Sequence, residues 1–295
     1  MHYRSSLIDA IAMKVTWLVA ALALTVSAAA AGEQGKYPDL RGQWAGVLRT
    51  ATGLKGQPSF DPSKSWGRFQ EAPLTPEYQA IMEDSIKDQE EGGFGAHRGG
   101  SCLGFGMPEI AYGFEPLEFI VTPEITYILV NWVEHTRRIY TDGREWPTDI
   151  EPTLTGYSIG HWIDEDLDGR YDVLEVETRG PFKGPRDYDA TGLPLHRDNQ
   201  SIFKERIYLD KTNKNVMHNE ITVIDHALTR PWTVTRDYRR NPNPRPNWKE
   251  FICAEANPYV TIEKETYFLS ADGLLMPAKK GQRPPDLRYF KPAGK

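Results

Sequence analysis

Apolar and polar residues alternate in short segments along most of the chain from residue 117 onward. The segments are rich in Val, Ile, Thr and aromatic residues and are separated by Gly, Asp and Pro, which is typical of half-buried strands joined by turns. Strands are predicted at 117–122, 126–133, 137–141, 158–163, 171–178, 201–209, 217–224, 232–238, 251–254 and 260–269. Helical segments do not alternate with these strands, so the pattern favours an antiparallel β-barrel or sandwich.

The region before residue 117 is expected to contribute one strand, one helix and long loops. Residues 40–49 are predicted as the strand, and 51–72 and 92–106 as loops rich in turn-forming residues. Thr75 as N-cap and Pro76 at the first helical position begin the helix. Its apolar stripe consists of Tyr78, Ile81, Met82 and Ile86. The predicted fold is therefore mainly β, an antiparallel barrel with one N-terminal helix and long loops.

The first residues have the layout of a secretory signal peptide. Lys14 is followed by the apolar run 17–26 and by small residues at 29–31, which matches a charged region, an apolar region and a cleavage site. The apolar run is shorter than the roughly 20 residues of a spanning helix. We therefore expect cleavage after Ala31, a periplasmic or secreted protein without a membrane span, and a single barrel domain over 32–295. Within that domain, a loop and helix segment occupies about 51–107 and a tail follows residue 277.

Charge, motifs and cysteines narrow the classes of function. The formal charge of -6 argues against nucleic acid or an anionic membrane as partner, because both need a concentrated basic patch. The chain has no His-Glu-x-x-His zinc motif, Rossmann glycine fingerprint or Cys-x-x-Cys pair, so no organic cofactor is expected. Cys102 and Cys253 are expected to form a disulfide in an exported protein, with two buried thiols as the alternative.

The segment 164–175 has the spacing of a calcium-binding loop. Acidic residues occupy positions 1, 3, 5, 9 and 12 of the twelve, and Gly169 occupies position 6, where the chain must reverse sharply. The predicted ligand residues are Asp164, Asp166, Asp168, Arg170, Asp172 and Glu175. Because the flanking segments resemble strands, we expect a hairpin turn around one structural Ca²⁺ and not a pair of EF-hands. The alternative is a solvated acidic turn that binds nothing.

The predicted strand 201–209 carries the main candidate for catalysis. Strand alternation places Glu205 on the same face as Phe203, Ile207 and Leu209. A carboxylate on that apolar face is desolvated, which suits a general acid or base near neutral pH. The alternative is an internal ion pair between Glu205 and an Arg of a neighbouring strand.

Further polar residues are candidates for supporting roles. His218 and Glu220 share one strand face, which either lines a lumen and suits proton transfer or simply faces solvent. His196, with Asp198 beside it, is a candidate in the loop before Glu205, and its alternative is a surface histidine. The remaining candidates are Asp142, which would assist the acid–base chemistry, and Arg138 and Tyr140, which would bind substrate and stabilise developing negative charge.

Three motifs, at 137–144, 156–162 and 230–233, resemble a widespread and mostly uncharacterised family of exported bacterial β-rich proteins. They read Arg-Arg-Ile-Tyr-Thr-Asp-Gly-Arg, Gly-Tyr-Ser-Ile-Gly-His-Trp and Arg-Pro-Trp-Thr. The resemblance spans most of the chain after the signal peptide and implies export and a β fold, but no particular activity. In many relatives a short turn stands where this chain has 164–175, so calcium would belong to a subset. Gly42-Gln43-Trp44 also resembles the opening of lipocalin-like barrels, which implies a structural Trp44 and an interior for a small apolar molecule.

Two functions follow as expectations. The first is a cofactor-independent lyase, hydratase or isomerase that holds an apolar or aromatic small molecule in the barrel and uses Glu205 as the principal acid or base. The second is a non-catalytic carrier or binding protein of the cell envelope with the same cavity. A lumen filled by side chains would argue against both.

Overall fold

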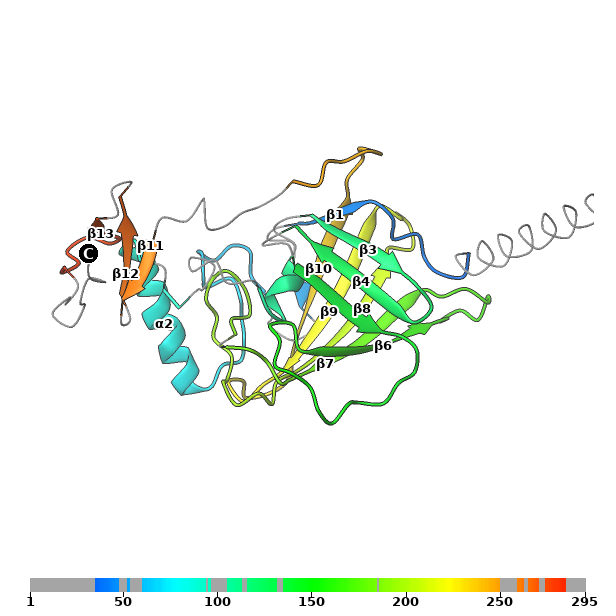
Figure 1. The fold of residues 1–295 in the computed structure, drawn as a ribbon, viewed down its shortest axis with the longest axis horizontal. Coiled ribbons are helices and arrows are strands. Elements are labelled where there is room, and N and C mark those ends of the chain that lie inside the picture. The colour runs from blue at the N-terminus through cyan, green and yellow to red at the C-terminus, as the bar shows by residue number, and fades with distance from the viewer. Residues whose placement is uncertain are drawn as a thin grey trace, which may run out of the picture.

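A computed structural model of the chain contains a closed barrel of antiparallel character beside a long helix and a small separate sheet (Figure 1). The structure describes residues 35–47, 52–53, 60–93, 95–96, 105–112, 116–131, 135–184, 186–249, 259–262, 265–270 and 274–284. The predicted strand 251–254, both cysteines and the predicted signal peptide lie outside these residues. The expected mainly β barrel with one helix is confirmed.

Nine strands form the barrel. They are β1 (Gln43–Gly46), β3 (Leu117–Val121), β4 (Ile125–Val130), β5 (His135–Tyr140), β6 (Tyr157–Ile163), β7 (Val173–Arg179), β8 (Ile202–Leu209), β9 (Val216–Ile224) and β10 (Trp232–Arg240). They follow one another in space in that order, and β1 pairs with β10, so that Trp44 lies opposite Arg240 and the barrel closes. The short β2 (Thr52–Gly53) adds to β10.

One neighbouring pair departs from the antiparallel pattern. Strands β5 and β6 run parallel, with Ile139 opposite Ser158. Hairpins can join antiparallel strands directly, but a parallel pair needs a long connection that returns to the starting edge. Residues 141–156 provide that connection as an extended loop on the outside of the barrel (Figure 1).

Alternation along the strands explains the core. On β8 the buried side chains are those of Phe203, Glu205, Ile207 and Leu209, and on β9 they are those of Met217, Asn219, Ile221 and Val223. Burial of the apolar side chains among these supplies about 1.5–3 kcal/mol each. Trp44 is fully buried, donates its indole N–H to the Leu40 carbonyl at 2.9 Å and packs under the Arg240 guanidinium. Trp44 is thus a structural residue.

The helix α2 (Pro76–Glu90) begins where the sequence predicted. Thr75 accepts a hydrogen bond from the Tyr78 N–H through its side chain, and Pro76 occupies the first turn, where its missing N–H costs nothing. Met82 and Ile86 are buried, but Ile81 is 41% exposed. The predicted apolar stripe is therefore only partly used for packing. A short 3-10 helix, Glu109–Tyr112, lies near one end of the barrel, and the Tyr238 hydroxyl donates to its Ala111 carbonyl.

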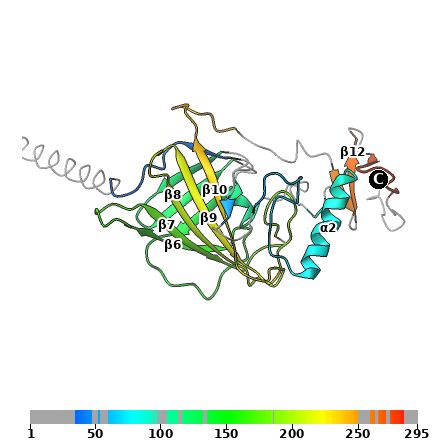
Figure 2. The same ribbon diagram turned by 180° about the vertical axis from the view of Figure 1, so that it is seen from behind.

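A second sheet lies beside α2 in both views (Figures 1 and 2). It consists of β11 (Tyr259–Ile262), β12 (Glu265–Leu269) and β13 (Leu275–Pro277). The prediction of one strand over 260–269 is wrong, because the chain reverses between Ile262 and Glu265 and pairs with itself. Lys279, just after β13, binds Asp88 of α2 at 2.5 Å and holds the sheet to the helix.

Candidate functional site

Glu205 lies in the barrel lumen as an ion pair. Its carboxylate accepts two hydrogen bonds from the Arg137 guanidinium, one of them 3.0 Å long, and a third from the Asn219 amide at 2.9 Å. The side chains of Arg137 and Glu205 are 2% and 0% exposed. Arg137 also donates to Thr178 at 2.9 Å. The structure therefore contains the internal ion pair that was the alternative to a catalytic Glu205, although Arg137 comes from a strand three places away.

The lumen beside this pair is nearly full. The cavity there measures about 10 Å³ and is lined by residues that include Phe119, Ile128, Ile207, Met217 and Tyr238. A single water molecule needs about 10–15 Å³ by the same measure. The cavity next to Arg137 and Asn219 therefore has room for about one water molecule, and the expected apolar ligand does not fit there.

Ser158 belongs to the same lumen network. It also lies in a sequence motif that usually occurs in a different structural setting. Residues 156–160 read Gly-Tyr-Ser-Ile-Gly, which has the spacing of a hydrolase nucleophile elbow. That elbow needs a strand-to-helix turn, whereas Ser158 lies inside β6. Its hydroxyl is buried and 2.8 Å from the Thr178 hydroxyl. Ser158 accepts hydrogen bonds from Arg137 and thus supports that side of the ion pair; within the part of the chain that the structure describes, no histidine is bonded to it.

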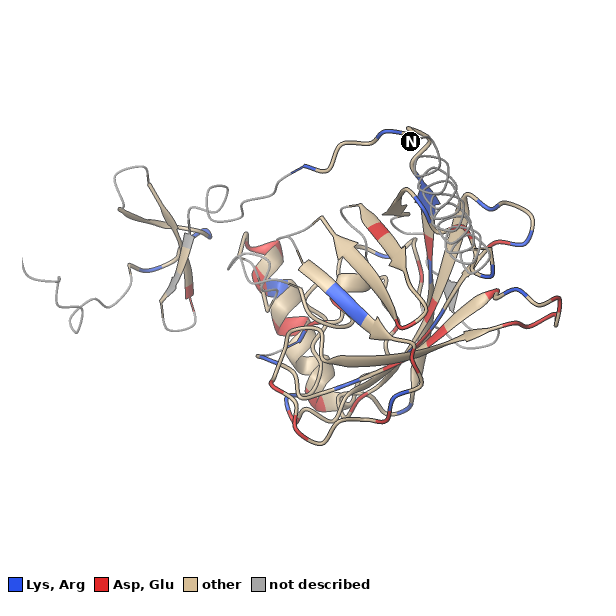
Figure 3. Cartoon of the chain, turned by 45° about the vertical axis from the view of Figure 1, so that its right-hand side comes forward, with Lys and Arg blue, Asp and Glu red and all other residues tan. Residues whose placement is uncertain are grey.

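A larger cavity lies on the outside of the barrel. It is a groove of about 470 Å³ across the outward faces of β6 to β9. Its lining includes Trp146, His161, Glu175, Glu177, Arg179, Lys204, Arg206, Glu220 and Thr222. The groove is therefore polar and carries both signs of charge, in keeping with the interspersed acidic and basic residues of the chain (Figure 3).

The charged side chains of this groove form ion pairs across neighbouring strands. Arg206 binds Glu175 at 3.1 Å, and Lys204 lies 3.5 Å from Glu177. The Arg179 guanidinium lies 4.5 Å from the centre of a Trp146 ring at the edge of the groove. These contacts fix the orientation of long side chains that would otherwise be mobile.

Glu220 is a catalytic candidate of the sequence whose side chain lines the groove. It faces outward and accepts a hydrogen bond from the Tyr208 hydroxyl at 2.8 Å. Burial of the phenol, and then its hydrogen bond to Glu220, raise the pKa of Tyr208. The pair therefore holds a proton between a carboxylate and a phenol at the surface of the groove.

His218 points outward as well but does not contact Glu220. Its Nδ1 lies 2.7 Å from Asp237, and its Nε2 lies 3.3 Å from Asp210. Hydrogen bonds from Thr212 and then from the Asn213 N–H lower the pKa of Asp210, and His218 adds to this effect. The structure thus places His218 between two carboxylates outside the barrel and not in a lumen with Glu220.

Asp142, Arg138 and Tyr140 lie away from the lumen pair. Asp142 binds Arg144 at 2.6 Å, and this hydrogen bond lowers the pKa of Asp142. The Arg144 guanidinium covers the Tyr140 ring at 3.8 Å, and Tyr140 stacks on Tyr157. Arg138 is exposed on the outer face of β5. These residues form an aromatic and cationic surface that continues through Tyr157 to Trp146 at the groove.

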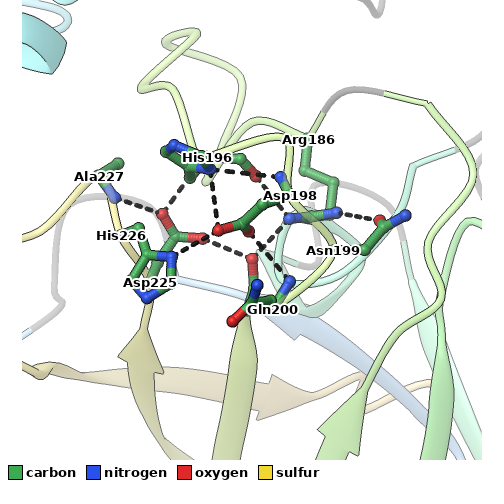
Figure 4. Close-up of polar contacts among 9 residues, drawn as sticks. Arg186, His196, Asp198, Asn199, Gln200, Asp225, His226 and Ala227 are labelled. Atoms are coloured by element: carbon green, nitrogen blue, oxygen red, sulfur yellow. Dashed lines mark hydrogen bonds and ion pairs between the residues drawn. The ribbon is translucent and has the colours of Figure 1, made fainter.

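His196, Asp198 and His226 form a cluster at one end of the barrel (Figure 4). One oxygen of Asp198, Oδ2, lies 3.1 Å from Nδ1 of His196 and 2.5 Å from Nδ1 of His226. Burial acts to raise the pKa of Asp198, but the Gln200 N–H and the two imidazoles outweigh it and lower this pKa to about 2. The sequence indicated His196 and Asp198. It gave no signal for His226, which comes from the loop between β9 and β10.

A second set of contacts holds this cluster in place. Asp225 accepts hydrogen bonds from the N–H groups of His196 at 2.9 Å and Ala227 at 2.8 Å, so one carboxylate ties both histidine loops together. The Arg186 guanidinium donates to the His196 carbonyl at 2.7 Å and to the Ser201 hydroxyl at 2.5 Å. Burial lowers the pKa of Arg186. The loop backbone is thus fixed by buried polar groups while the imidazoles stay accessible.

The predicted calcium loop turns sharply and gathers three carboxylates. Asp164, Asp166 and Asp172 place ligand oxygens within 4.8 Å of one another. Leu167 and Gly169 have positive φ angles of 62° and 89°, as a tight reversal requires. The predicted ligand residues Asp168 and Arg170 lie within this turn, where the Asp168 N–H donates to Asp164 at 3.2 Å and the Arg170 N–H donates to Asp168 at 2.8 Å. The side chain of Glu175, the predicted twelfth-position ligand, instead binds Arg206 in the groove.

A buried acidic cluster was not anticipated from the sequence. Glu109, Asp187 and Asp189 are all buried near one end of the barrel. Burial, together with the negative charges of Asp187 and Asp189, raises the pKa of Glu109 well above its usual value. Asp189 accepts from the Thr191 N–H at 3.0 Å and from the Gln70 amide. Nothing in the alternation pattern singles out these residues, since two of them lie in a loop.

The fold and these sites define a β-barrel protein with a buried ion pair in its lumen and polar sites on its outside. No model of a known protein family matches the chain, and no curated protein matches it either. The resemblance to exported bacterial proteins therefore stays a prediction. Among the described residues, no helix has both the length and the apolar character needed to cross a bilayer.

Proposed function

We propose that this protein binds a small polar molecule in the groove outside strands β6 to β9. The observation that carries the proposal is the volume of about 470 Å³ in this groove, compared with about 10 Å³ in the lumen cavity beside Arg137 and Asn219. Small-molecule sites occupy roughly 300–1,000 Å³. The groove therefore offers the space that the lumen does not, and the protein acts as a binding barrel through its outer face.

The lining of the groove indicates the chemistry of the ligand. Carboxylates and cations alternate along its floor, so a ligand with both hydrogen-bond donors and acceptors can be held without leaving charges unpaired. Trp146 at the edge supplies an apolar face on which a flat or ring-shaped portion can pack. We therefore expect a polar ring compound, and not the purely apolar molecule that the sequence suggested.

A screen of polar ring compounds by thermal shift and native mass spectrometry tests the proposal. Ligands found in this way should lose affinity in Trp146→Ala, which removes the apolar edge, and in Thr222→Trp, which fills the floor. Trp248→Ala is a matched control, because Trp248 is partly exposed and does not line the groove. Ligands that bind both groove variants as tightly as the unmodified protein would refute this location.

A second candidate function is acid–base catalysis in the same groove. The hydrogen bond between Tyr208 and Glu220 favours it, because it provides a positioned proton donor and acceptor next to the cavity. The reaction class would be the lyase, hydratase or isomerase chemistry expected from the sequence, with Glu220 in the role assigned to Glu205. Catalysis is supported if the unmodified protein turns over a groove ligand and Glu220→Gln, with Tyr208 and the fold intact, does not. Binding without turnover identifies a carrier.

Export is part of the proposed function. The layout of residues 1–31 supports it, and the test is the mass of the protein recovered from the periplasm or medium of a bacterial host. A mature chain that begins at Gly32 is the expected result. A full-length chain retained in the cytoplasm would contradict export.

A further inference from the structure

We propose that His196, Asp198 and His226 bind a divalent transition-metal ion, with zinc or iron(II) as the best match. This site is separate from the groove and from the acidic loop. Two imidazoles and one carboxylate, contributed by two loops at one end of the barrel, form the set of three protein ligands typical of metal centres that act on small molecules.

The donor atoms are already close to the spacing that a metal ion imposes. Each of the three residues offers a ligand atom, and these atoms all lie within 4.8 Å of one another. A tetrahedral ion with bonds of about 2.0–2.1 Å separates neighbouring ligand atoms by about 3.3 Å. His196 Nδ1 lies 3.1 Å from Asp198 Oδ2, which is near this value. His226 Nδ1, at 2.5 Å from the same oxygen, needs to move away by less than 1 Å, which the exposed side chain of His226 permits by rotation.

The surroundings of Asp198 leave one oxygen directed at both histidines. Its Oδ1 accepts a hydrogen bond from the Gln200 N–H at 3.0 Å, while Oδ2 faces the two imidazoles. Ligating carboxylates in metal sites are commonly oriented in this way by a hydrogen bond to the second oxygen. The Asp198 N–H donates to His196 Nδ1 at 3.3 Å, so this nitrogen carries no proton, and a bound ion would replace the N–H at its lone pair.

The backbone behind the ligands is held by groups that do not bind the ion. Asp225 fixes the His196 backbone and reaches the loop of His226 through the Ala227 N–H. Ser201 donates to Asp225 at 2.5 Å and accepts from Arg186. Such a supporting shell reduces the entropy lost when the ion binds.

The exposure of the cluster determines what the ion could do. The side chains of His226, His196 and Asp198 are 62%, 37% and 21% exposed. An ion held by these three residues keeps at least one position open to water or to a ligand, which distinguishes reactive sites from closed structural ones. A bound ion would polarise a carbonyl or activate a water molecule at that position.

The same chemistry separates this site from the acidic loop. Ca²⁺ prefers six to eight oxygen ligands, as the loop around Asp164, Asp166 and Asp172 could supply, whereas imidazole nitrogen suits zinc and iron. Zinc binding at the histidine cluster should therefore persist in excess calcium.

The test uses the full mature protein, stripped of metal by a chelator and free of any histidine tag. Titration with Zn²⁺ by calorimetry in millimolar Ca²⁺ should show one site per chain, and Co²⁺ should give visible absorption bands of a low-symmetry nitrogen and oxygen site. Because outer-shell changes alone weaken metal sites by about 10–100-fold, loss of a ligand in His226→Ala or Asp198→Asn should weaken zinc binding at least about tenfold.

Two controls keep the result interpretable. His218→Ala removes a histidine that also lies between carboxylates, and Asp166→Asn alters the acidic loop; neither should change the zinc affinity by more than about twofold. His226 is exposed, so His226→Ala should keep the native far-UV spectrum and melting temperature. The proposal is overturned if the protein binds no zinc under these conditions, or if His226→Ala binds it as tightly as the unmodified protein.

Discussion

Arg137 of β5 and Glu205 of β8 join opposite walls of the barrel through a bidentate ion pair that is buried from solvent. Two other strands separate them around the barrel, so the pair spans the lumen and does not simply connect neighbours. Asn219 and Thr178 satisfy further hydrogen-bonding groups of the two side chains. The polar centre of this barrel is therefore a buried ion pair that connects its walls across the lumen.

Removing one partner of this ion pair should destabilise the fold strongly. Glu205→Gln leaves the Arg137 charge buried without its carboxylate, and breaking such a pair costs about 3–5 kcal/mol. The double change Arg137→Met with Glu205→Leu should recover much of this loss, because neither buried charge then remains. Urea unfolding of the three proteins measures the effect. Glu177→Gln, in a surface ion pair with Arg179, is the control and should cost under about 1 kcal/mol.

Trp44 should be needed for closure of the barrel. It is fully buried where β1 pairs with β10, and its indole N–H binds the Leu40 carbonyl. Trp44→Ala removes this packing and should cost about 3–5 kcal/mol, whereas Trp248→Ala at a half-exposed position should cost far less. Thermal unfolding followed by near-UV circular dichroism compares the two. Equal stability of both variants would contradict a closing role for Trp44.

Alternation along the strand that is β8 was enough to predict which of its residues share the apolar face. It placed Glu205 with Phe203 and Ile207, and the structure confirms that all three are buried. Local capping chemistry likewise predicted where α2 begins, because Thr75 and Pro76 act within one turn. These features depend on residues that are close together in the sequence.

The remaining features depend on contacts between distant residues. Trp44 meets Arg240 only when nine strands close, and the lumen cavity is lined by side chains from strands far apart in the sequence, such as β3 and β10. His226 approaches Asp198 because two loops end at the same rim of the barrel. No local pattern contains this information, so the sequence could indicate His196 and Asp198 but not His226.

Glu109 should make the stability of the protein depend on pH. Burial, reinforced by Asp187 and Asp189, raises its folded-state pKa, so the folded chain holds this proton more tightly than the unfolded chain. As the pH rises above the pKa of Glu in the unfolded chain, about 4.3, Glu109 destabilises the fold progressively until the pH passes its folded-state pKa. Glu109→Gln removes this penalty and should gain stability relative to the unmodified protein between pH 5 and pH 8. Urea unfolding at both pH values, with exposed Glu145→Gln as control, checks the sign.

Calcium should stabilise the hairpin between β6 and β7 if the acidic loop binds it. The carboxylates of Asp164, Asp166 and Asp172 repel one another at their spacing within 4.8 Å, and a bound Ca²⁺ would relieve this repulsion. Ligand at about 100 times its dissociation constant adds about 2.7 kcal/mol of stability, so the melting temperature should rise by several degrees in calcium and fall again with EGTA. Asp166→Asn should abolish most of this shift, whereas Asp149→Asn, an exposed acid outside the loop, should leave it intact. A calcium-independent melting temperature in the unmodified protein would identify the loop as an acidic turn held only by its own N–H groups, such as those of Asp168 and Gly169.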